Sequence, residues 1–142
     1  FDFLQIQSQL PILFPAHPRT LKKIEDFELN ALIDSMPNLK ICDPLNYHQM
    51  IQANENAKFV LTDSGGLQEE TTVLGIPCIT LRENTERPIT VEKGTSELVG
   101  SDPDKIQNAF ERIMNGQWKK GCIPEGWDGK AAERISEVFA AL

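Results

Sequence analysis

Short apolar runs alternate along this chain with longer amphipathic stretches. An apolar run bounded by turn residues is typical of a buried strand, and apolar positions three or four apart are typical of a helix that covers one. Their alternation predicts βα units in an α/β fold, a Rossmann-like, doubly wound parallel sheet with helices on both faces. The predicted strands are residues 12–15, 38–42, 58–62, 78–81 and a short fifth at 98–99; the predicted helices are 20–35, 45–53, 66–74, 102–114 and 130–142, with 1–8 as the tail of another.

The length of 142 residues fits a single domain, and we expect residues 1–142 to form one. With 14 Lys and Arg against 21 Asp and Glu, the net charge is −7, which disfavours nucleic acid and anionic membranes as partners. No apolar run approaches the ~18 residues of a membrane span, and the N-terminus does not resemble a signal peptide. Because the chain begins at Phe1, we expect it to be a piece of a longer protein.

The three cysteines, Cys42, Cys78 and Cys122, are far apart and form no CxxC pair. They therefore predict neither a disulfide framework nor a zinc site, and we expect no metal and no cofactor. This cysteine usage, together with the absence of a leader, predicts a cytoplasmic protein.

The turn at residues 62–66, Thr-Asp-Ser-Gly-Gly, lies between the best-defined strand and a helix. Ligands of open α/β sheets bind at this edge, and the first amides of a helix attract anions. Gly65 and Gly66 would let a ligand approach the backbone, and Ser64 adds a hydroxyl donor, so the turn is a candidate phosphate or diphosphate site. The alternative is a plain βα turn in which the glycines only shape the backbone.

Two charged residues extend this hypothesis. Glu70 shares a helix face with Gly66 and could accept hydrogen bonds from a ribose diol, whereas Glu69 is rotated away and is expected to be solvated. Arg87 follows the fourth strand and could bind a diphosphate through two hydrogen bonds. The alternatives are that both glutamates only complement the helix dipole and that Arg87 pairs with Glu86 or Glu83.

His17 follows the first predicted strand, in a loop over residues 16–20 at the same sheet edge. An imidazole there could act as a general acid for a leaving phosphate or donate a hydrogen bond to it. The alternative is a purely structural histidine.

Several motifs together resemble the C-terminal half of non-hydrolysing UDP-N-acetylglucosamine 2-epimerases. The resemblance covers essentially the whole chain, in register. The motifs are FPAHPRT at 14–20, LTDSGGLQEE at 61–70, LGIPCITLRENTERP at 74–88, GTSELVG at 94–100 and WDGKAAERI at 127–135.

This resemblance implies the C-terminal half of a two-domain, GT-B-type fold, with a UDP-sugar in the cleft between the domains. Ser64, Gly65 and Gly66 would bind the diphosphate, Glu70 the ribose, and Arg87 the phosphates, while His17 matches the active-site histidine. The family reaction interconverts UDP-GlcNAc and UDP-ManNAc by elimination and re-addition of UDP. It implies a role in cell-wall polysaccharide biosynthesis.

The carboxylates that move the sugar-ring proton belong to an N-terminal domain that this chain lacks. The implied partners are therefore that domain, the UDP-sugar and, in the full-length protein, a second subunit of a homodimer. Two other hypotheses stay open at this point. The chain could belong to a UDP-sugar-dependent GT-B glycosyltransferase, or it could be a nucleotide-binding module without catalysis.

Overall fold

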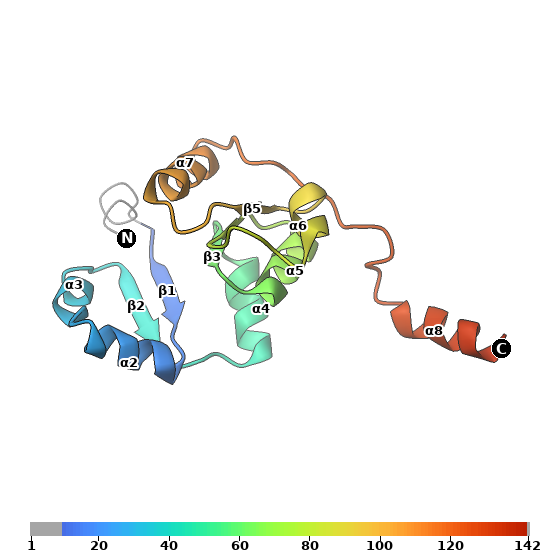
Figure 1. The fold of residues 1–142 in the computed structure, drawn as a ribbon, viewed down its shortest axis with the longest axis horizontal. Coiled ribbons are helices and arrows are strands. Elements are labelled where there is room, and N and C mark those ends of the chain that lie inside the picture. Colours follow the sequence, from blue (N-terminus) through green and yellow to red (C-terminus); the bar gives the residue numbers. More distant parts are fainter. Residues whose placement is uncertain (1–9, 142) are drawn as a thin grey trace. The chain divides into compact units, whose positions relative to one another are not determined.

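The computed structural model describes residues 10–141 of the protein (Figure 1). The chain divides into two compact units, with the boundary between Met50 and Ile51. We call the part up to Met50 the first unit and the part from Ile51 onwards the second unit. Each unit contains its own parallel sheet.

The first unit is a single βαβ arrangement. Strand β1 (Ile12–Pro15) pairs in parallel with β2 (Leu39–Cys42), and helices α2 (Pro18–Asp26) and α3 (Asn30–Asp34) lie between them in the chain. A parallel pair needs such a crossover connection, because a tight turn can join only antiparallel strands. Both strands were predicted from their apolar runs, and both predictions are confirmed.

The helical segment of this unit differs from the prediction in two ways. The single helix expected over residues 20–35 is interrupted, since Glu28 adopts a φ of +54°, which no α-helix continues. The loop expected over residues 16–20 is shorter, because Pro18 already occupies the first helical position, where its missing N–H costs nothing.

Helix α4 (Tyr47–Glu55) begins later than expected. The predicted helix starts at residue 45, but Asn46 caps the observed one: the Gln49 amide donates to Asn46 Oδ1, and the Asn46 amide donates to Gln49 Oε1. This reciprocal pair satisfies two amides at the start of the helix at once, and therefore sets where it begins.

The second unit contains a three-stranded parallel sheet in the order β3 (Val60–Thr62), β4 (Cys78–Thr80), β5 (Ser96–Leu98). Thr62, Thr80 and Leu98 are paired across it, so the three strands end at one level. The segments that follow these strands therefore leave the sheet at the same edge.

Helices cover both faces of this sheet (Figure 1). Helices α5 (Gly65–Leu74) and α7 (Pro103–Met114) both contact β4, from opposite sides. The short helix α6 (Pro88–Glu92) packs against β5 and α5. Helix α5 ends at Leu74, where the predicted helix ends, because Gly75 adopts a left-handed conformation with a φ of +71°.

The two faces of the sheet have different chemistry because successive residues of a strand point to opposite sides. The side chains buried between α7 and the sheet are apolar: Ile79 of β4 and Ala109, Phe110 and Ile113 of α7 are at most 4% exposed. The rings of Phe59 and Phe110 meet edge to face. Burying an Ile or Phe side chain contributes about 1.5–3 kcal/mol. The α5 side is instead rich in hydroxyl and amide groups, among them Gln68, Thr71, Thr80 and Thr90.

The segment after α7 returns along the edge strand β5. The Trp118 indole donates to the carbonyl of Thr95, its ring stacks against Arg112, and Arg112 holds Glu97 through two hydrogen bonds. The last helix, α8 (Ala131–Ala140), confirms the predicted C-terminal helix, whose final residue lies outside the described residues, as does the predicted helix tail at 1–8.

The prediction of an α/β fold built on parallel strands is confirmed. The strands form two hydrogen-bonded ladders, of two and three strands, where one sheet was expected. The helices on both faces of the second ladder are the doubly wound arrangement that the alternating pattern predicts.

Candidate functional site

The turn between β3 and α5 forms the centre of the candidate site. Ser64 occupies the N-cap position with an extended backbone, and its amide donates to Thr62 Oγ1 at 3.0 Å. The first bond within the helix runs from the Gln68 amide to the Ser64 carbonyl, so the amides of Gly65, Gly66 and Leu67 have no acceptor inside α5. The Ser64 hydroxyl does not cap the helix either. Unpaired amides at a helix N-terminus are the kind of donors that can hold an anion.

The fold does not require glycine at positions 65 and 66. Neither residue has a positive φ, and a Cβ atom would meet nothing nearer than 3.8 Å at Gly65 and 3.9 Å at Gly66. At Gly94, in contrast, a Cβ would lie 2.3 Å from Thr72 Oγ1 and 2.6 Å from the Thr90 carbonyl oxygen. The missing side chains at 65 and 66 therefore leave space beside the free amides.

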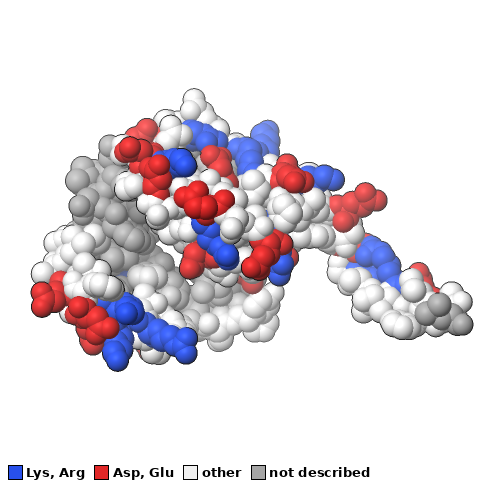
Figure 2. Space-filling model, viewed as in Figure 1, with Lys and Arg blue, Asp and Glu red and all other residues white. Residues whose placement is uncertain are grey.

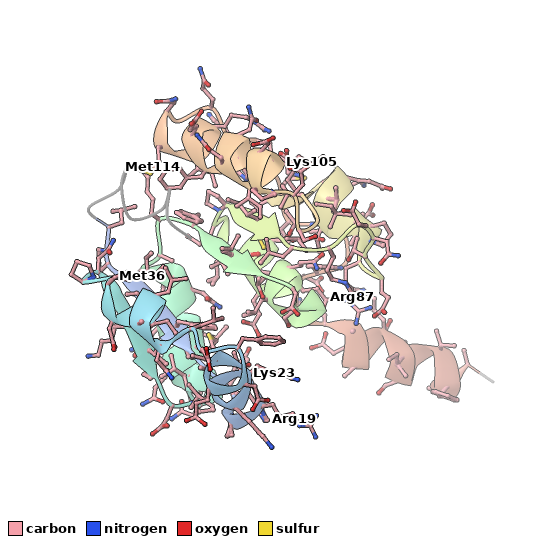
Figure 3. All side chains as sticks on the ribbon, turned by 60° about the vertical axis from the view of Figure 1, so that its left-hand side comes forward. Arg19, Lys23, Met36, Arg87, Lys105 and Met114 are labelled. Carbon is pink, nitrogen blue, oxygen red and sulfur yellow. The ribbon has the colours of Figure 1, made fainter. Side chains whose placement is uncertain are left out.

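Arg87 lies next to this turn, at the start of α6 (Figure 3). The atom nearest to a Cβ on Gly65 would be Arg87 Cγ, at 3.8 Å. The Arg87 Nε lies 2.8 Å from Glu69 Oε1, whereas Glu83 or Glu86 was the ion-pair partner considered from the sequence. The expectation that Glu69 is merely solvated is therefore wrong, because the loop before α6 brings Arg87 onto α5.

Glu70 is half-buried and is held by a residue that the sequence analysis missed. Asn54 Nδ2 donates to Glu70 Oε2 at 3.2 Å, and Asn54 itself is only 5% exposed. The amide thus fixes one carboxylate oxygen of Glu70 and leaves the other for a second donor. No local pattern could have identified Asn54, because the contact joins α4 to α5 across 16 residues of chain.

His17 belongs to the first unit, where it is exposed and caps α2. Its Nδ1 accepts a hydrogen bond from the Arg19 amide at 3.2 Å. In this arrangement the proton of the neutral imidazole lies on Nε2. The structural role considered for His17 is therefore that of a helix cap. This cap uses Nδ1 and leaves Nε2 free of it.

A second group of residues that the sequence analysis missed connects helix α5 to the segment that carries Arg87. The Gln68 side-chain oxygen accepts from Thr85 and Thr90, which in turn bond the main chain of Arg87. Gln68 stands between Leu67 and Glu69 in a mostly polar segment, so the sequence marked neither its burial nor its partners.

The cysteines take no part in this site. Cys42 and Cys78 lie in β2 and β4 as predicted, and burial raises the pKa of the Cys78 thiol, which keeps it protonated and unreactive.

Among residues 10–141, no three His, Cys, Asp or Glu side chains lie close enough to hold a metal ion. Nor is any helix in that range long and apolar enough to cross a membrane. Acidic and basic side chains are interspersed over the face shown in Figure 2.

Comparison with known proteins connects this geometry to a family. Residues 2–140 match the family profile of UDP-N-acetylglucosamine 2-epimerase. The enzyme of this name from Methanocaldococcus jannaschii is 42% identical over 141 residues, which are 98% of this chain and 37% of that protein. The Escherichia coli enzyme of the same name is 32% identical over 97% of this chain and 37% of its own length.

Solved structures agree with these matches. The M. jannaschii UDP-GlcNAc 2-epimerase in complex with UDP-GlcNAc and UDP superposes with a TM-score of 0.80 at 40% identity, over all of this chain and 38% of that one. The enzyme from Neisseria meningitidis bound to UDP-GlcNAc gives 0.84 at 29% identity, over 99% of this chain and 38% of that one. The chain thus spans a little over a third of the length of these relatives. It belongs to the UDP-N-acetylglucosamine 2-epimerase family.

Proposed function

We propose that residues 1–142 are the UDP-binding, C-terminal domain of a UDP-N-acetylglucosamine 2-epimerase. The observation that carries this proposal is the open turn at Gly65 and Gly66, whose free amides lie beside a guanidinium and whose glycines the fold itself does not need. Relatives that share the fold bind UDP and UDP-GlcNAc.

The diphosphate lies on the amides of Gly65 and Gly66, the Ser64 hydroxyl and the Arg87 guanidinium. Arg87 still has N–H groups free of Glu69, because the ion pair uses Nε. Charge-assisted hydrogen bonds to a phosphate are about twice as strong as neutral ones. Helix amides and one arginine thus provide a site for a dianion on a chain that is acidic overall.

Glu70 accepts hydrogen bonds from the ribose hydroxyls. A carboxylate has two oxygens, and the Asn54 bond to Oε2 fixes the plane in which both lie. This role resembles that of the acidic residue which binds the ribose diol in dinucleotide-binding βαβ units.

His17 acts on the bond that breaks. The family reaction removes the proton from C2 of the sugar and expels UDP from C1, which leaves a 2-acetamidoglucal. Re-addition of UDP and of a proton at the other face of C2 gives the epimer. His17 Nε2 donates to the departing phosphate oxygen, whose negative charge grows as the C1–O bond breaks.

Half of the cleft that binds the UDP-sugar belongs to an N-terminal domain, which supplies the carboxylates for the C2 proton. The 142-residue chain alone therefore binds UDP weakly and does not epimerise, because proximity and proton transfer both depend on the second domain. The full-length protein is a cytoplasmic homodimer in cell-wall polysaccharide biosynthesis.

The test is calorimetry of the full-length protein with UDP and with uridine. Arg87→Ala should weaken UDP binding by about 10- to 100-fold, as expected for the loss of hydrogen bonds to a charged group, and leave uridine binding unchanged. Turnover of UDP-GlcNAc in heavy water should place deuterium at C2. A protein that binds uridine and UDP equally well, or that turns over without deuterium incorporation, would refute the proposal.

A further inference from the structure

Gln68 is fully buried at the second turn of α5, and its side chain is aimed at the loop that carries Arg87. It is 0% exposed. Its Oε1 accepts hydrogen bonds from Thr85 Oγ1 at 2.9 Å and from Thr90 Oγ1 at 3.2 Å. A buried amide with two partners from one loop fixes that loop, because these bonds cannot be replaced by water.

The two threonines bracket Arg87. Thr85 Oγ1 accepts from the Arg87 amide at 3.0 Å, and Thr90 Oγ1 lies 2.7 Å from the Arg87 carbonyl, to which it can donate. Thr85 thus links the Arg87 N–H to Gln68 Oε1, because its hydroxyl accepts from the one and donates to the other. The single Thr90 proton serves either the Arg87 carbonyl, at 2.7 Å, or Gln68 Oε1, at 3.2 Å, so Thr85 provides the continuous link.

The ion pair with Glu69 cannot fix the position of Arg87 by itself. Both of its side chains are about 40% exposed, at 43% and 39%, and exposed pairs contribute little to fixing a conformation. Gln68 lies on the same helix as Gly65, three residues further on. Its bonds therefore set the separation between the α5 amides and the Arg87 guanidinium.

We propose that Gln68, acting through Thr85 and Thr90, is the positioning residue that holds Arg87 at the diphosphate site. This inference rests on the proposed function, because it concerns how the same UDP is bound. It assigns no contact between Gln68 and the ligand. It predicts instead that breaking the hydroxyl link disturbs only the phosphate part of recognition.

Thr85 offers the sharpest variants, since it is only half-buried and a matched pair exists. In the full-length protein, Thr85→Val removes the hydroxyl with little change of shape, and Thr85→Ser keeps it. We expect Thr85→Val to weaken UDP binding about tenfold and uridine binding by less than about twofold, with Thr85→Ser close to the wild type. Gln68→Leu should act in the same direction, and a thermal melt checks that it folds.

A control and a double variant complete the experiment. Thr95→Val makes the same change at a buried threonine whose hydroxyl has no partner, and it should leave UDP binding unchanged. Thr85→Val combined with Arg87→Ala should bind UDP no more weakly than Arg87→Ala alone, because both act through one guanidinium.

The outcomes separate the two proposals. Unchanged UDP binding in Thr85→Val, an equal loss for UDP and uridine, or additive losses in the double variant would overturn the role of Gln68 and leave Arg87 in place. Insensitivity of UDP binding to Arg87→Ala would overturn the proposed function and this inference together.

Discussion

Arg87 Nε lies 2.8 Å from Glu69 Oε1, so the guanidinium assigned to the diphosphate already has an anionic partner. Glu69 is adjacent to Glu70 in the sequence, and its side chain projects from a different face of α5. A bound diphosphate would place two further negative charges near this carboxylate. Glu69 therefore competes with the ligand for Arg87.

Glu69→Gln should tighten UDP binding by about threefold, because the change removes one like charge from a partly exposed site where screening keeps the effect small. Uridine binding should not change. Calorimetry at low and high salt measures the effect, which should shrink as the salt concentration rises. Glu92→Gln, the same change at an exposed position at the end of α6, is the control. Weaker UDP binding in Glu69→Gln would mean that Glu69 orients Arg87 rather than competing with its ligand.

Alanine at Gly65 or Gly66 separates ligand binding from folding. A methyl group at either position meets only ordinary contacts, and alanine is favoured over glycine in a helix by up to about 1 kcal/mol. The free energy of unfolding in urea should therefore stay the same or rise. UDP affinity should fall by about tenfold or more, since the methyl group occupies the space beside the free amides. A variant that keeps wild-type UDP affinity would remove that glycine from the site.

Gly94→Ala should have the opposite signature. Its Cβ would lie 2.3 Å from Thr72 Oγ1 and 2.6 Å from the Thr90 carbonyl oxygen, in a buried and closely packed place. We expect a loss of about 3 kcal/mol or more in the free energy of unfolding, as for other overpacked positions. Urea unfolding followed by circular dichroism measures it. A stability equal to that of the wild type would show that α6 shifts freely against α5.

Most of the framework could be predicted from the sequence, and the contacts within the site could not. The strand before Ser64 and the helix after it follow from local signals, an apolar run and a pair of glycines, and parallel register then brings the Arg87 loop to the same sheet edge. The partners of Glu69, Glu70 and Gln68 depend on which helix packs on which. Such contacts join residues 16 to 22 positions apart, and no periodicity in one segment encodes them.

The Asn54–Glu70 bond leads to a prediction about the ribose. If Glu70 accepts from the 2′-hydroxyl, the wild-type protein binds UDP more tightly than 2′-deoxy-UDP, by about tenfold for a hydrogen bond to a charged group. Glu70→Ala should abolish this preference, and Asn54→Ala should reduce it, because the carboxylate then loses its orientation. Competition binding with both nucleotides measures the ratio. A preference that survives in Glu70→Ala would assign the ribose to another residue.

His17 has a structural role as a helix cap and a proposed chemical role as a proton donor, and two substitutions distinguish these roles. The Nδ1 atom caps α2 through the Arg19 amide, and Asn is as good an N-cap residue as exists. His17→Ala should therefore lower the free energy of unfolding by about 1 kcal/mol, whereas His17→Asn should preserve it. Asn cannot supply the proton that Nε2 would give to the departing phosphate, so both variants should lower kcat by about 100-fold or more in the full-length enzyme.

Asp102→Ala is the matched control for this experiment. Asp102 caps α7 by accepting from the amides of Asp104 and Lys105, so its loss should also cost about 1 kcal/mol of stability, with kcat unchanged. UDP affinity of both His17 variants should stay within about threefold of the wild type, because a transition-state donor lowers kcat without lowering ground-state binding. Recovery of kcat by His17→Asn would show that the imidazole serves only as a helix cap, and equal losses of kcat and UDP affinity would make His17 a binding residue.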